Sequence, residues 1–66
     1  MQVSEARRIG RSRRYQVLVD GQVVLEADEE VIAQFGLAPG RMLGEDTISE
    51  AQRADQALLA ARAALR

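Results

Sequence analysis

The sequence predicts an α+β fold, in which a small N-terminal antiparallel β-hairpin or three-stranded meander precedes a short helix and a long C-terminal helix. Three observations lead to this expectation. Asp20-Gly21 separates two strings of strand-forming residues, and this dipeptide tolerates the positive φ angles of a tight hairpin turn. A corner that contains glycine and proline follows at residues 36–40. Beyond the corner, apolar residues recur at alternating spacings of three and four, which indicates one helix face.

The β-ribbon is expected over residues 3–27. Residues 3–9 alternate as a first strand, and the glycine and serine within residues 10–13 favour a turn. Residues 14–19 and 22–27 are rich in Val, Leu and Tyr, which favour extended structure. These segments predict an antiparallel meander of three strands.

The register of the hairpin follows from its two-residue loop. Counting outward from the loop, Val17 faces Val24 and Gln16 faces Leu25. Both faces of the ribbon then carry apolar residues: Tyr15, Val17 and Val24 on one, and Leu18, Val23 and Leu25 on the other. We therefore expect one face to pack on helix and the other on a neighbour.

A short helix is expected over residues 29–35. Asp28 suits the N-cap, because its carboxylate accepts hydrogen bonds from amides of the first turn. Gly36 suits the left-handed position after the helix, with Leu37 folding back as its apolar partner. Gly40 is expected to supply a second positive φ angle after the proline.

The long helix is expected over residues 46–65. Thr47 and Glu50 have the spacing of a capping box. The apolar seam consists of Ala51, Ala54, Leu58, Ala61 and Leu65. A seam of this length exceeds what one short helix and a small sheet can cover. We therefore expect it to form an interface with a second copy, in a homo-oligomer, or with further helical repeats of a longer protein.

Composition points to one small domain over residues 1–66 that buries only a modest core. The chain has no Cys and no His, so it has neither a disulfide nor the usual ligands of a structural zinc ion. No apolar run approaches the ~20 residues that span a bilayer, and no signal-peptide core is present. We expect a cytoplasmic protein stabilised by a partner surface, with no cofactor and no membrane contact.

Catalytic residues are missing from the sequence. There is no His, Cys or Lys, and no serine has a general base beside it. An acidic cluster at residues 26–30 is of a kind that caps and solvates a helix start, so we expect no metal site there. The sequence therefore predicts a binding protein and not an enzyme.

Arginines near the N-terminus form the clearest candidate site. Residues 1–14 hold five Arg and one acid, whereas residues 15–55 hold nine acids and only two Arg. Guanidinium groups make forked hydrogen bonds to phosphate or carboxylate. The candidate nucleic-acid or partner-binding residues are Arg7, Arg8, Arg11, Arg13, Arg14 and Tyr15. Tyr15 either stacks on a base or, as strand tyrosines more often do, covers the core. The alternatives are an acidic protein partner, or charges that only keep an edge strand soluble.

The run from the second strand onward resembles the start of RecX regulatory proteins. The matching segments are Tyr-Gln-Val-Leu-Val-Asp-Gly at residues 15–21, Asp-Glu-Glu-Val-Ile at 28–32, Phe-Gly-Leu-Ala-Pro-Gly at 35–40, and Leu-Gly-Glu-Asp at 43–46 with Ile48. The resemblance implies a non-enzymatic module that contacts DNA or a RecA-like recombinase filament and modulates recombination and DNA repair. In RecX the tandem three-helix repeats follow such a segment, and this chain extends only to where the first repeat begins.

Residues 30–41 are also similar to the helix and Gly/Pro corner of AbrB-type domains. Those domains form swapped-hairpin dimers in DNA-binding transcription regulators and antitoxins. Their helix follows Ile-Pro, where this chain has Ala27-Asp28, and a strand follows their corner, where this chain has an acidic helix start. An AbrB-like dimeric regulator is therefore the alternative function, and an oligomerisation module is a further one.

Overall fold

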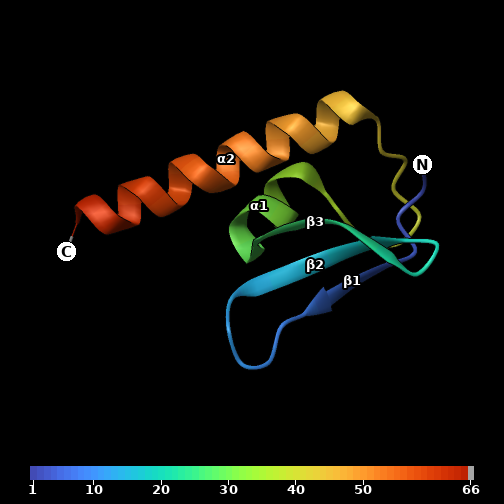
Figure 1. Ribbon diagram of the computed structural model, residues 1–66, viewed down its shortest axis with the longest axis horizontal. Helices are drawn as coiled ribbons and strands as arrows, with labels where there is room; N and C mark the ends of the chain where they lie inside the picture. The colour runs from blue at the N-terminus through green and yellow to red at the C-terminus, as the bar shows by residue number, and fades with distance from the viewer. Residues whose placement is uncertain (66) are drawn as a thin grey trace.

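The computed structural model describes residues 1–65 and shows a three-stranded antiparallel sheet with two helices, which confirms the α+β class. The elements in chain order are β1 (Glu5–Arg8), β2 (Arg14–Val19), β3 (Gln22–Asp28), α1 (Glu29–Phe35) and α2 (Glu45–Ala64). The strands lie in the order β1-β2-β3, with α1 over the sheet and α2 as a long rod above both (Figure 1). Arg66, the last residue of the expected domain, lies outside the described residues.

The hairpin register differs from the expected one because β3 contains a β-bulge. Leu18 pairs with Val23 as expected, but Val17 pairs with Leu25, so Val24 is an extra residue in β3. A bulge places two residues of one strand opposite one residue of the other and shifts all later side chains to the other face. The expected pairings of Val17 with Val24 and of Gln16 with Leu25 are therefore wrong. Leu25 instead joins Val17 in the core.

The core lies between the sheet and the two helices. Its buried members are Val3, Val17, Val19, Leu25, Ala27, Val31, Leu37, Leu43 and Ala51. The N-terminal residues reach it because they run beside the segment before α2: Val3 donates its amide to Arg41 and accepts from Gly40, and Gln2 pairs with Met42. The Gly/Pro corner thus holds the chain's beginning against the start of α2.

Local signals set the ends of α1. Asp28 accepts a hydrogen bond from the Glu30 amide at 2.9 Å, which confirms the expected N-cap. Gly36 has φ 61°, and Leu37 behind it is fully buried, as expected for a left-handed helix end. The capping box at Thr47 and Glu50 is wrong, because α2 begins two residues before Thr47 with Gly44 as an N-cap that makes no side-chain hydrogen bond.

The buried stripe of α2 is rotated relative to the expected seam. Ala51 is fully buried in the chain's own core, whereas Ala61 and Leu65 are exposed, Leu65 at 87%. The residues of α2 that face the rest of the chain are Ile48, Ala51, Ala54, Asp55, Leu58 and Arg62. The distal half of the helix therefore carries an uncovered apolar face, and α2 extends beyond the sheet at its C-terminal end (Figure 1).

Candidate partner-binding arginine surface

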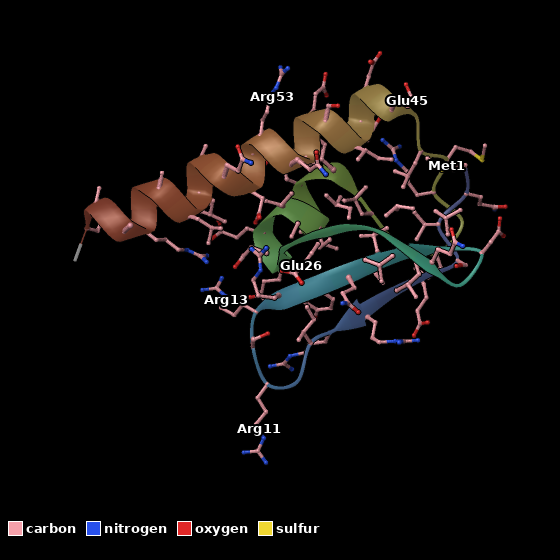
Figure 2. The ribbon with its side chains drawn as sticks, in the orientation of Figure 1. Met1, Arg11, Arg13, Glu26, Glu45 and Arg53 are labelled. Carbon is pink, nitrogen blue, oxygen red and sulfur yellow. The ribbon has the colours of Figure 1, made fainter. Side chains whose placement is uncertain are left out.

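The structure divides the N-terminal arginines into those that hold the fold together and those that remain available. The candidate arginines are close together in the sequence, but their side chains point in different directions. Figure 2 shows Arg11 pointing away from the molecule at the tip of the β1–β2 turn, whereas Arg13 lies close to α1. Arg7 and Arg8 also lie on opposite faces of the sheet, because Arg7 is paired with Gln16 and Arg8 with Tyr15.

Arg14 is a structural residue that joins β2 to α2. Its two terminal nitrogens donate to the Asp55 carboxylate at 2.7 and 3.0 Å, and one of them also donates to Glu26 at 3.3 Å. Asp55 is 6% exposed and also accepts from the Asp28 amide at 2.9 Å. The hydrogen bond to Asp55 raises the pKa of Arg14 above its ordinary value. Forked pairs of this kind are strong and directional.

A second forked pair joins α2 to the end of β3, and here the arginine lies on the helix and the aspartate on the sheet. Arg62 of α2 donates to the two oxygens of Asp28 at 2.7 and 3.4 Å, and Asp28 is 1% exposed. The hydrogen bond from Arg62 lowers the pKa of Asp28 below the ordinary aspartate range, although burial opposes this shift, and the Glu30 amide lowers it further. Sequence inspection missed both Asp55 and Arg62 as partners of the sheet.

Arg7 and Arg13 make ion pairs at the surface. Arg7 meets Glu5 at 3.1 Å, and Arg13 meets Glu29 at 3.0 Å, with all four side chains about half exposed. Exposed pairs contribute roughly 0–1 kcal/mol each and exchange readily with solvent. These two arginines are accessible, but each already has a carboxylate beside it.

Arg8, at the end of β1, and Arg11, in the β1–β2 turn, have no ion-pair partner within residues 1–65. The Ser12 hydroxyl donates to the Ile9 carbonyl and accepts from the Arg14 amide. Arg8 donates to the carbonyls of Ser12 at 2.9 Å and Arg11 at 3.2 Å, so its guanidinium ties the end of β1 to the backbone of the turn. Among residues 1–65 the Arg11 side chain has no ion-pair partner. The turn therefore exposes positively charged side chains on a backbone that hydrogen bonds hold in place.

The remaining candidate residues are Tyr15 in β2 and the residues of the expected interface along α2. Tyr15 is half-buried in β2, opposite Arg8 and Ala27, so its ring lies near the arginine turn. Ala51 is enclosed within the chain and is not accessible to a partner. Leu58 and Ala54 are partly covered by the core, which leaves Ala61 and Leu65 as the exposed part of the expected interface on α2.

The described part of the chain offers no enclosed chemical site. Residues 1–65 contain neither a detectable pocket nor a group of three carboxylates arranged to hold a metal ion. The acidic cluster at residues 26–30 instead caps α1 and pairs with Arg13, Arg14 and Arg62. Neither α1 nor α2 combines the length and apolar character required to cross a membrane.

The chain folds as a small α+β module, and it is similar to a solved structure over almost its whole length. The chain is similar to a structure described as regulatory protein RecX, with a TM-score of 0.88 and 31% identity. The match covers 97% of this chain and 32% of that one, so the chain spans about a third of the RecX structure. Neither a protein-family model nor a curated protein matches the sequence. The likeness to RecX is thus supported as a structural neighbour over almost the whole chain.

Proposed function

We propose that this chain is a RecX-like, non-enzymatic regulatory module that contacts DNA or a RecA-like nucleoprotein filament and so modulates recombination or DNA repair. The observation that carries the proposal is the structural and sequence match to regulatory protein RecX along 97% of the chain. The filament and DNA as partners come from the family resemblance of residues 14–48. Arg8 and Arg11, which form no ion pair among the described residues 1–65, are compatible with an anionic partner.

The proposed mechanism is electrostatic capture followed by packing. Arg8 and Arg11 attract the partner, and Arg7 and Arg13 can exchange their exposed carboxylates for its anionic groups. Arg14 is removed from this set, because Asp55 and Glu26 already hold its guanidinium. The exposed apolar residues of distal α2 then supply a surface on which a partner helix packs.

A recombinase assay tests the proposal. The ATPase rate of a RecA-like recombinase on single-stranded DNA is measured with increasing amounts of the chain, and the filament is sedimented to detect bound chain. We expect co-sedimentation and a lower ATPase rate. A chain that stays in the supernatant and leaves the rate unchanged refutes the regulatory function.

An oligomerisation module is the second candidate, and the uncovered face of distal α2 favours it. Leu59 is 44% exposed and Leu65 is 87% exposed, both on the half of the helix that projects from the sheet. Light scattering measures the molar mass in solution. A monomer at all concentrations removes this candidate, and it also removes an AbrB-like dimer.

A further inference from the structure

The β1–β2 turn is held in one conformation by its own side chains. Ile9 donates its amide to the Arg14 carbonyl at 2.9 Å, and Ser12 bonds back to Ile9 through both its amide and its hydroxyl. Arg8 donates to two more carbonyls of the turn, those of Arg11 and Ser12. A segment that is already ordered loses little conformational entropy when it binds, so this turn is preorganised for contact.

The electrostatics of the turn differ from those of the rest of the molecule. Residues 6–19 contain no acid, and the carboxylates that neutralise Arg13 and Arg14 come from β3, α1 and α2. Those carboxylates do not reach the tip. Arg8 makes its two hydrogen bonds to neutral carbonyls, so it keeps its charge and has further N–H groups available. Within residues 1–65, Arg8 and Arg11 therefore have no ion-pair partner.

Residues 9–13 themselves carry no exposed large apolar side chain, and Tyr15 beside them is half-buried. Interfaces between proteins depend on apolar or aromatic anchors that become buried at their centre. The exposed large apolar side chains in the part of the chain that the structure describes lie elsewhere: Met1, Val23, Met42, Leu59 and Leu65. Contact with a nucleic-acid backbone needs no such anchor, because its free energy comes from guanidinium–phosphate pairs and the release of counterions.

We propose that the turn at residues 9–13, with Arg8 and Arg11, is a preformed site for the phosphodiester backbone of a nucleic acid, which it binds without reading sequence. This inference rests on the proposed regulatory function and assigns its nucleic-acid contact to one turn. Arg11 reaches outward to one phosphate. Arg8 offers its unused N–H groups to the same or the adjacent phosphate, while it keeps the turn closed.

The test is a fluorescence anisotropy titration of the whole chain on a labelled oligonucleotide of mixed sequence. The titration is repeated at salt concentrations from about 50 to about 200 mM, a range over which phosphate contacts make affinity strongly salt-dependent. Arg11→Ala removes one phosphate contact. We expect it to weaken binding about tenfold at the lowest salt and to reduce the salt slope by about 0.9 on duplex or about 0.7 on single strands. Circular dichroism checks the fold, which Arg11→Ala should leave unchanged because Arg11 makes no side-chain bond within residues 1–65.

Arg53→Ala is the matched control. Arg53 is an exposed arginine of α2 that points away from the sheet, so its removal changes the net charge equally at a distant place (Figure 2). Equal effects of Arg11→Ala and Arg53→Ala overturn the inference. If the chain binds the recombinase filament but not free oligonucleotide, or binds polyglutamate more tightly than oligonucleotide, the inference also fails while the regulatory function stands. Absence of binding to both filament and oligonucleotide refutes the function itself.

Discussion

Replacing Asp55 with Asn removes one charge at the point where the sheet and α2 are joined. Asp55→Asn keeps the side-chain volume and retains an acceptor for the Asp28 amide, but it places an NH2 group against the Arg14 guanidinium. Hydrogen bonds to charged groups contribute about 1.5–3 kcal/mol each. Because Arg14 is 26% exposed and keeps Glu26, we expect a loss of about 2 kcal/mol in the free energy of unfolding. That is a large share of the roughly 3–10 kcal/mol typical of a domain of this size.

Urea denaturation followed by far-UV circular dichroism measures this loss, and a thermal scan should show the melting temperature about 10 °C lower. Glu50→Gln is the control, because Glu50 is an exposed acid on the same helix that makes no ion pair within residues 1–65. We expect that control to change stability by less than about 0.5 kcal/mol. If Asp55→Asn and Glu50→Gln are equally stable, the forked pair does not hold α2 to the sheet and the reasoning is wrong.

Three other outcomes follow from the same geometry. Arg62 lowers the pKa of Asp28 in the folded state. The stability that this pair contributes is therefore complete above the unfolded aspartate pKa of about 3.9 and is lost as the pH falls through the lower, folded pKa. Urea titrations across acidic pH should show this loss of stability, and the Asp28→Asn variant should show a weaker dependence of stability on pH. Gly44→Ser should stabilise the protein by about 0.5–1 kcal/mol in thermal melts, because Gly44 is an N-cap without a side-chain bond; a lower melting temperature would contradict this. Amides of residues 59–64 should exchange with deuterium faster than those of residues 51–55, since only the latter segment is packed on the core; uniform protection would show that distal α2 is covered.

The sequence predicts those parts of the fold that short-range chemistry decides. The Asp20-Gly21 turn, the Asp28 cap and the Gly36 helix end each depend on residues within a few positions, and all three occur as expected. The bulge at Val24 left no such signal. Val23, Val24 and Leu25 are all apolar, so no alternation marks which of them is the extra residue.

The arginine surface was only partly predictable, because its pairing crosses the chain. Arg14 and Asp55 are 41 residues apart, and nothing local to Arg14 indicates a carboxylate on a distant helix. A signal did exist in α2: Ala51, Asp55, Leu58 and Arg62 recur at spacings of four, three and four, so two charged residues share a buried helix face. A charged residue in an apolar stripe commonly has a buried partner.

The exchanged polarity of the two forked pairs has an evolutionary consequence. At each pair, loss of the arginine leaves a buried carboxylate without its ion-pair partner, which costs more than loss of both members. Substitutions at positions 14 and 55 should therefore accumulate together in descendants of this sequence, including joint replacement by apolar residues. Position 28 is under a second restraint, because it also caps α1. Because Asp28 cannot easily change, its partner Arg62 should be substituted less often than its half-exposed location on the helix suggests.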